Sequence, residues 1–518
     1  MIPRTLAVGG VRALLGALIL WGFLPARLSA ATPREDERDW RKLVTPNFQL
    51  YSNTRDLEGQ RLLRELEVYR HFVSRFLGLT NVQREPALVV LFDSERAFTP
   101  YKPRYEGKPR AVNGFHVADP LGTALALMRQ ARGDETMRVL FHEYTHLLTS
   151  RQFRDAPVWA HEGVAEVFST FESAGDHYDI GVAITNHVRS MQRNRPVPVA
   201  SLLGVGRDSP DYNERDRAGR FYATSWLLAH HLLFGLRGYE TDVMARYAAI
   251  CSTTTNKSQA FRLAFGKVPS AFDADLAEYL KGGRYTLVRQ SEPDLEEARP
   301  IAVRLDPGEL DYALGRLLQL TQQGEAARAR MGESLRRAPE NPNPRAALAL
   351  MAWREHRPDE VRSLTDDAIA LGSKNAFVHY LGAEVRYQQI MKLVNRGEDQ
   401  TEALQRGRGR CERAVVLDPE LAAAHHLLGV YVLAQNPKAP AIAAMHVREA
   451  IRCDPQYLPA QLTWSTLLAA QGQWEAAREA ISRLLAGPLP ADLREGAQAV
   501  SDRIDRAMKV REVRKPNR

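Results

Sequence analysis

The sequence predicts an α+β domain with a small mixed sheet, followed by an all-α array of helical repeats. Alternating or continuous apolar stretches, typical of strands, are confined to about the first 130 residues. From Glu135 onward the apolar residues recur mainly at helical spacing. Beyond residue 300 the composition shifts to Ala, Leu, Arg and Glu in paired helical segments, where an internal repeat is expected.

The N-terminus has the pattern of a secretory signal peptide. Arg4 and Arg12 precede the uncharged run ALLGALILWGFL, which is too short to span a bilayer as a mature helix. Small residues follow in LSAAT, so we expect residues 1–31 to be removed and the mature chain to start near Thr32. This predicts an exported protein, periplasmic or secreted. The alternative is a retained anchor, and only then would the protein contact a membrane.

The composition indicates a globular protein whose partner is not nucleic acid. Of the 518 residues, 44% are hydrophobic and 25% are charged, which is enough for a large core. Residues 1–31 hold three arginines and no acid, so without them the net charge falls from +8 to +5, 67 basic minus 62 acidic residues. That excess is mild, and no dense basic block lies among aromatics.

The three cysteines are too few and too scattered for a disulfide scaffold or a thiolate metal cluster. Cys411 and Cys453 fall in the helical C-terminal half of the chain. We expect both to be core residues.

Strands and one helix are expected before residue 130. Residues 47–53, NFQLYSN, alternate like a strand, and residues 56–77 carry apolar residues at helical spacing. The run PALVVLFDS reads as a buried strand. Residues 114–117 and 124–127 are two short extended candidates, separated by the turn-like sequence DPLG.

Three helices are expected next, over residues 136–149, 158–171 and 220–234. Asp155-Ala156-Pro157 fits an N-cap followed by a proline in the first turn of the second helix. Residues 201–217, rich in Gly, Asp and Pro, are expected to form a surface loop.

An internal repeat is visible in the C-terminal half. Asp418-Pro419 and Asp454-Pro455 are 36 positions apart, and each precedes a similar pair of helical segments. This pattern resembles the tetratricopeptide repeat, with weaker copies over residues 310–338 and 341–371 and a lengthened copy over 375–417. Unrelated helical hairpins are the alternative. Either way, neighbouring hairpins must bury one another's apolar faces, which predicts an array that receives a protein partner.

The segment HEYTH is the HExxH motif, and it lies inside the helical pattern VLFHEYTHLL. His142 and His146 project from one helix face at adjacent turns, so both imidazoles can reach a single Zn²⁺. Glu143 between them can then take a proton from water at the open coordination position. The motif alone is a weak signal, because three fixed residues occasionally coincide in a long chain.

A third ligand is needed, and the next predicted helix offers two carboxylates. Glu162 lies 16 positions beyond His146, and Glu166 lies one turn further. A salt-bridged surface is the alternative explanation for these residues. However, apolar neighbours such as Leu140 and Trp159 place both helices in a core, where unpaired His and Glu would be costly.

HEYTH followed by WAHEGVAE resembles the gluzincin zinc metallopeptidases, in which HExxH is followed by WxxEGxAE in aminopeptidase-like members. The resemblance implies Glu162 as the third zinc ligand and Glu166 as a second-shell residue that holds a ligand histidine. The spacing is slightly shorter than the commonest one in that clan, which leaves the ligand carboxylate open between the two. His161 points about 100° away around the helix and is expected to be structural or at the rim of the site.

The same resemblance implies a tyrosine on a later helix that reaches the zinc, and Tyr222 in GRFYATSWLLAHHLL is the candidate oxyanion donor. Its alternative role is packing against Trp226. His230 and His231 are a second possibility, for which a core or surface role is favoured. An edge strand that pairs with substrate is implied over residues 114–127. No GxMEN-type sequence occurs near it, which favours an endopeptidase.

Together these features predict a gluzincin-like α+β metallopeptidase domain over residues 32–290, with a small mixed sheet and active-site helices. An all-α tetratricopeptide-like solenoid over 300–490 and a terminal helix with a basic tail over 491–518 follow. The expected function is hydrolysis of peptide or protein substrates by an exported zinc enzyme. The alternative is an interaction scaffold with an inactive or self-limited metal domain, although retention of Glu143 argues against it.

Overall fold

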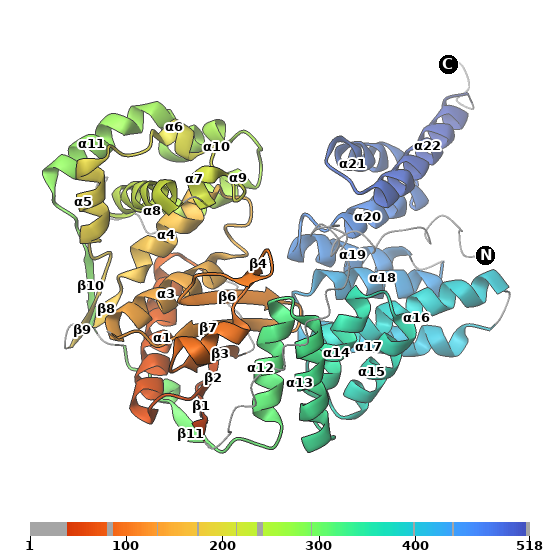
Figure 1. Ribbon diagram of the computed structural model, residues 1–518. Helices are drawn as coiled ribbons and strands as arrows, with labels where there is room; N and C mark the ends of the chain where they lie inside the picture. The colour runs from red at the N-terminus through yellow and green to blue at the C-terminus, as the bar shows by residue number, and fades with distance from the viewer. Residues whose placement is uncertain are drawn as a thin grey trace. The chain divides into compact units, whose positions relative to one another are not determined.

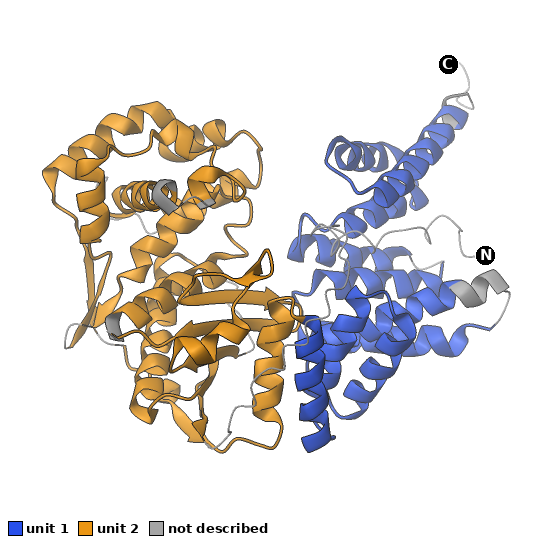
Figure 2. Ribbon diagram, in the orientation of Figure 1, with its two compact units in different colours: residues 1–31, 324–518 blue, residues 32–323 orange. Residues whose placement is uncertain are grey.

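A computed structural model describes residues 39–79, 86–131, 133–173, 176–213, 215–235, 242–291, 293–396, 399–437 and 440–513. The predicted signal peptide lies outside these residues. The chain divides into two compact units (Figure 2). We call the unit that ends at Gln323, orange and labelled unit 2 in Figure 2, the first unit, and the unit that runs from Gly324 onward, blue and labelled unit 1, the second unit. None of the described helices is long and apolar enough to cross a membrane.

The first unit is built around a six-stranded mixed sheet with the order β11-β1-β2-β3-β7-β6 (Figure 1). β2, β3 and β7 are parallel to one another, and the other neighbours pair antiparallel. The predicted small mixed sheet is therefore confirmed, with β6 at one edge. The strands are β1 (Arg41–Val44), β2 (Phe48–Ser52), β3 (Ala87–Phe92), β6 (Gly114–Asp119), β7 (Gly122–Met128) and β11 (Ile301–Val303).

Two helices, α1 (Asp56–Phe76) and α3 (Gly133–Thr149), pack against each other and against the sheet. The central strand β3 is almost continuously apolar and buried, as expected for a strand covered on both faces. Tyr69 of α1 stacks on Phe141 of α3 with ring centroids 4.3 Å apart, and its hydroxyl donates to the Phe141 carbonyl oxygen at 3.2 Å. This contact fixes the position of α3, which carries HEYTH.

The helix α4 (Val158–Ser169) packs against α3 and, more extensively, against α8 (Arg215–His230). The approach of α4 to α8 requires a glycine, because a Cβ atom added at Gly163 would lie 2.4 Å from the carbonyl oxygen of Ser225. Gly163 directly follows Glu162, so the small residue that permits the packing also places that carboxylate. A π-helical turn, η4 (His231–Gly235), continues α8.

The segment predicted as a surface loop, residues 201–217, is only partly irregular. It contains the one-turn helix α7 (Pro210–Asn213), and α6 (Val199–Leu202) ends within it. Tyr212 of α7 packs its ring 5.9 Å from that of Phe221. One-turn helices leave no apolar periodicity in a sequence, so the composition alone suggested a loop.

The remaining elements of the first unit complete its periphery, including a three-stranded sheet β10-β9-β8 and a two-stranded ribbon β4-β5. They are α2 (Glu95–Phe98), η3 (Thr99–Tyr101), β4 (Arg104–Tyr105), β5 (Lys108–Pro109), β8 (Glu172–Ser173), β9 (His177–Ile180), α5 (Thr185–Arg193), α9 (Val243–Cys251), α10 (Lys257–Phe265), η5 (Pro269–Ala271), α11 (Phe272–Gly282), β10 (Val288–Ser291) and η6 (Glu296–Ala298).

The unit boundary lies later than the composition change near residue 300 suggested. β11 pairs with β1 in the first unit, and α12 (Glu309–Leu320) belongs there too. Arg316 of α12 forms a buried bidentate pair with Asp119 at the β6–β7 turn, with nitrogen–oxygen distances of 2.9 and 2.6 Å. Composition marks α12 as helical but does not indicate which core it joins.

The second unit confirms the predicted all-α array of helix pairs. Each helix packs on the next, so successive hairpins bury one another's apolar faces. Cys411 and Cys453 are buried here, as predicted. The helices are α13 (Gly324–Arg337), α14 (Pro342–Arg354), α15 (Pro358–Ala370), α16 (Ala376–Arg396), α17 (Thr401–Leu417), α18 (Ala422–Gln435), α19 (Pro440–Cys453), α20 (Leu458–Ala470), α21 (Trp474–Ala486) and α22 (Ala491–Val513).

Candidate metal centre

The two histidines of HEYTH face the same space from adjacent turns of α3. Their Nε2 atoms lie 3.2 Å apart, and their ring centroids are separated by 4.8 Å. The side chains of His142 and His146 are 18% and 13% exposed, so the site is largely buried but reachable from solvent.

Glu162 of α4 completes a triangle of ligand-type atoms. Its Oε2 lies 3.4 Å from His142 Nε2 and 3.3 Å from His146 Nε2. Ligands bound about 2.0 to 2.1 Å from a tetrahedral zinc ion lie about 3.3 to 3.4 Å from one another. The three sides of this triangle therefore match three corners of a zinc coordination tetrahedron.

The hydrogen bonding of Glu162 fits the same interpretation. Its Oε1 accepts a hydrogen bond from the Tyr212 hydroxyl at 3.0 Å. Its Oε2 is buried and has no hydrogen-bond partner of good geometry among the described residues. A buried carboxylate oxygen without such a partner is costly unless a cation compensates it. The residues present thus fit a divalent metal ion.

Charge in the site favours a cation. Burial alone would lower the pKa of His142, but the nearby carboxylates of Glu162, Glu166 and Glu143 raise it to about 9. Burial would raise the pKa of Glu162, yet the two histidines hold it well below its ordinary value. The carboxylates therefore remain ionised and give the site a negative potential.

Glu166 lies on the other side of His142. Its Oε1 is 3.6 Å from His142 Nδ1, and its Oε2 is 3.1 Å from His187 Nε2 and 3.4 Å from Arg138. Glu162, and not Glu166, thus faces the Nε2 atoms of both α3 histidines. Glu166 lies instead on the Nδ1 side of the His142 imidazole.

Glu143 meets a residue that sequence reasoning did not single out. His116, on the edge strand β6, lies with its Nδ1 2.6 Å from Glu143 Oε2. Burial would raise the pKa of Glu143, but this hydrogen bond and the neighbouring histidines lower it. The two side chains are 31% and 24% exposed and form the open side of the site. In the sequence, this contact is indicated only by the position of His116 within the strand that is expected to lie beside the metal.

Two tyrosines, Tyr212 of α7 and Tyr222 of α8, lie near Glu162. The rings of Tyr212 and Tyr222 lie 6.0 Å apart, and their hydroxyl groups interact. Burial, followed by the charge of Glu162, raises the pKa of Tyr212 to about 12 and also raises that of Tyr222. Both hydroxyls therefore keep their protons at neutral pH and can donate hydrogen bonds.

The other histidines considered from the sequence have different surroundings. His161 lies 6.2 Å from the Phe153 ring, and burial lowers its pKa to about 4. His230 is fully buried between the Gly181 carbonyl oxygen and the Tyr279 hydroxyl, each 2.8 Å away. These contacts are structural.

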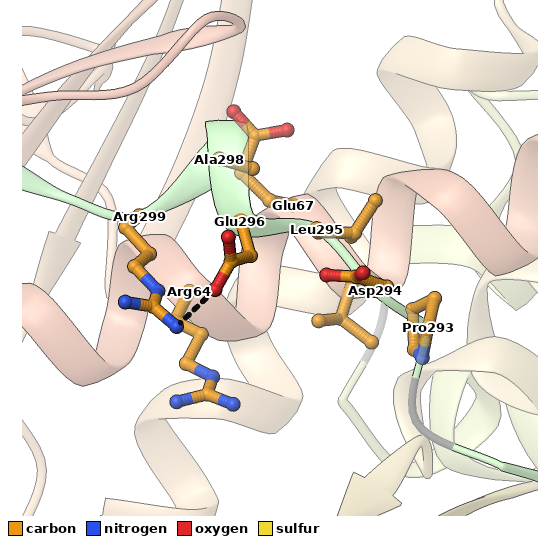
Figure 3. Close-up of a pocket in the computed structure, with 9 residues that line it drawn as sticks. Arg64, Glu67, Pro293, Asp294, Leu295, Glu296, Ala298 and Arg299 are labelled. Atoms are coloured by element: carbon orange, nitrogen blue, oxygen red, sulfur yellow. Dashed lines mark hydrogen bonds and ion pairs between the residues drawn. The ribbon is translucent and has the colours of Figure 1, made fainter.

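A separate pocket lies between α1 and the segment 293–299 (Figure 3). Its charged lining is largely paired already, since Arg299 donates to Glu296 at 2.9 Å and Glu67 accepts from Asn47 at 3.0 and 2.7 Å. None of the metal-type ligands of α3 and α4 lines it. We assign this pocket no part in the site.

No protein-family model matches the sequence, and no curated protein matches it. Similar solved structures include pilF of Pseudomonas aeruginosa, which is 21% identical, with a TM-score of 0.31, covering 40% of this chain and 86% of that one. YrrB, described as a TPR protein with an unusual peptide-binding site, is 16% identical, with a TM-score of 0.29, covering 36% and 90%. Yeast Tom70 is 14% identical, with a TM-score of 0.31, covering 63% and 58%. At these TM-scores the likenesses assign no function to this chain.

Proposed function

We propose that the first unit is a zinc-dependent peptidase of the gluzincin type and that the helical array recruits its substrate or a protein partner. The proposal is carried by the triangle of His142 Nε2, His146 Nε2 and Glu162 Oε2, whose sides measure 3.2, 3.3 and 3.4 Å. Export to the periplasm or exterior belongs to the same proposal and rests on the pattern of residues 1–31.

His142, His146 and Glu162 would hold the zinc ion, and Glu166 would orient His142. When bound, zinc supplies Lewis-acid chemistry, making water nucleophilic at neutral pH and polarising a carbonyl oxygen. Glu143 accepts the proton of the attacking water and passes it to the leaving amine as the carbon–nitrogen bond breaks. Tyr222 donates a hydrogen bond to the carbonyl oxygen as negative charge develops on it.

The edge strand supplies a place for the substrate backbone. β6 ends the sheet order, so its outer backbone groups can pair with an extended peptide. His116 on this strand contacts Glu143, which puts the proposed peptide path beside the proposed base. Pairing through the backbone gives affinity that does not depend on substrate sequence.

An interaction scaffold is the second candidate function, with the metal domain inactive or self-limited. It is favoured by large apolar side chains that the array leaves exposed. Ile442 and Met445 on α19 are 52% and 58% exposed, and Val416 on α17 is 67% exposed. Ile442 and Met445 are three residues apart on one helix, so their side chains lie on one face and offer apolar surface to a protein partner.

Zinc content and cleavage of a mixed peptide library separate the two candidates. We expect wild type to cleave, Glu143→Gln to lose cleavage while retaining zinc, and the double variant His142→Ala/His146→Ala to lose about one zinc ion per chain. The cleavage positions also report whether the enzyme acts within peptides or at their ends. Equal zinc in wild type and the double variant would contradict the metal site. Zinc at the α3 site with no cleavage of library or protein substrates would favour the scaffold.

A further inference from the structure

A second group of metal-type ligands lies in the helical array. His425 of α18 and Glu449 and Cys453 of α19 each offer one ligand atom, and these three atoms lie within 4.8 Å of one another. Glu449 and Cys453 are four residues apart, so they project from adjacent turns of one helix face. The same spacing brings His142 and His146 together on α3.

His425 presents a free lone pair to this group. Its Nε2 lies 3.0 Å from the Pro419 carbonyl oxygen and must donate the hydrogen there, which leaves Nδ1 unprotonated in the neutral ring. That Nδ1 atom is buried and has no hydrogen-bond partner among the described residues, although His425 is only 6% exposed. Metal-binding histidines commonly donate their second ring nitrogen to a backbone carbonyl in this way.

The repeat itself explains the Nε2 contact but not the free Nδ1. At corresponding places in the other hairpins, Arg345, His379 and Gln461 also donate to the carbonyl oxygen six residues earlier in the chain. Gln461 makes this bond exactly 36 positions after His425 and offers no imidazole lone pair. The bond is thus a common device of the array, and the ligand group on α18 and α19 is an addition to it.

We propose that His425 Nδ1, the Glu449 carboxylate and Cys453 Sγ bind a divalent cation of the zinc class, which clamps α18 to α19. Imidazole, thiolate and carboxylate together suit zinc better than calcium or magnesium, which prefer oxygen ligands alone. His446, one turn before Glu449, lies outside this group of ligand atoms, so water would complete the coordination of the cation. This proposal does not depend on peptidase activity.

Cation binding changes two existing contacts. The Cys453 thiol donates to the Pro419 carbonyl oxygen at 3.5 Å and gives up this hydrogen as a thiolate ligand, and Arg452 must be displaced. It donates to Glu449 at 2.7 Å and to Cys453 Sγ at 3.4 Å. Its side chain is 54% exposed, and it also donates to Glu420 at 2.8 Å. The guanidinium therefore keeps a carboxylate partner when Glu449 turns toward the metal.

The test is metal analysis of the full chain after equilibration with zinc and removal of the excess. Wild type should hold about two zinc ions per chain, and His425→Gln and Cys453→Ser should each lose about one. His425→Gln keeps a donor for the Pro419 carbonyl, as Gln461 does for Pro455, so it removes the ligand and preserves the repeat contact. Gln461→Ala and Cys411→Ser are matched controls that should keep both ions.

Cobalt substitution assigns the ion to this group, because the α3 site contains no thiolate. The cobalt-loaded His142→Ala/His146→Ala variant should retain a near-ultraviolet thiolate-to-cobalt absorption band, and further addition of Cys453→Ser should abolish it. Absence of the band from cobalt-loaded wild type, or unchanged zinc in folded His425→Gln, would overturn the proposal. If only the His142→Ala/His146→Ala variant lost zinc, the cation site on α18 and α19 would also be ruled out. The peptidase proposal would remain intact.

Discussion

The two units each bury a glutamate, and the two carboxyl groups respond in opposite ways. Glu162 in the first unit is 4% exposed, and two imidazoles hold its pKa well below the ordinary value. Glu384 in the array is 2% exposed, and burial raises its pKa to about 7, against a smaller lowering by Gln388. A buried carboxylate stays charged where a neighbouring helix brings imidazoles to it, and such a place can accept a cation.

The largest expected effect distinguishes the two tyrosines of the metal centre. Tyr222→Phe should lower kcat about 10²- to 10³-fold with zinc retained, because a hydrogen bond to the developing oxyanion is lost. Tyr212→Phe should instead weaken zinc binding roughly 10- to 100-fold, because its hydroxyl donates to Glu162, the proposed ligand. Peptide cleavage rates and zinc titration measure the two effects. An unchanged kcat in zinc-loaded Tyr222→Phe would assign that residue to packing.

Gly163→Ala should destabilise the first unit by roughly 3 kcal/mol and displace Glu162, because the new methyl group would meet the Ser225 carbonyl oxygen at 2.4 Å. Urea unfolding and zinc affinity measure the change. Gly219→Ala on the same helix pair is the control, since a Cβ there meets nothing within 4 Å. It should be neutral or slightly stabilising. Equal effects of the two substitutions would show that close helix approach does not position the carboxylate.

Glu384→Gln should stabilise the array, and more so as pH rises. The carboxyl has a folded pKa of about 7, above its unfolded value, so below about pH 4 both states are protonated and the substitution gains little. As the pH rises from about 4 toward 7, Glu384 ionises in the unfolded chain before it does so in the folded chain. The free energy of unfolding of the wild type therefore falls by about 2 to 3 kcal/mol by pH 8. Urea unfolding at pH 4.5 and 8 measures this difference. The exposed Glu479→Gln on α21 should show no comparable dependence, and a pH-independent gain would argue against a raised pKa.

Periodicity could predict α3, α4 and the helix pairs, because the apolar residues of each helix recur at helical spacing within that helix. The resemblance of WAHEGVAE to the gluzincin motif predicts Glu162 as a ligand without any geometry. His116, His187 and Tyr212 could not be found in the same way, since they come from β6, α5 and a one-turn helix. Their contacts with Glu143, Glu166 and Glu162 span 27, 21 and 50 residues, and a single sequence does not encode such separations in a local pattern.

The smallest expected effect tests whether a turn in the array affects only the stability of its own helical hairpin. His356, in the turn between α14 and α15, has a φ of 58°, whereas glycines occupy the same conformation at Gly372 and Gly472, with φ of 82° and 77°. His356→Gly should therefore stabilise the array by about 0.5 to 1 kcal/mol, because glycine has no Cβ strain there. Gly472→Ala should destabilise it by a similar amount, and urea unfolding compares the two. Neither substitution should alter zinc binding at α3, since a turn in the array acts only on its own hairpin. If His356→Gly instead lowered stability, contacts of the imidazole would outweigh the backbone strain, and the turns would differ from one hairpin to the next.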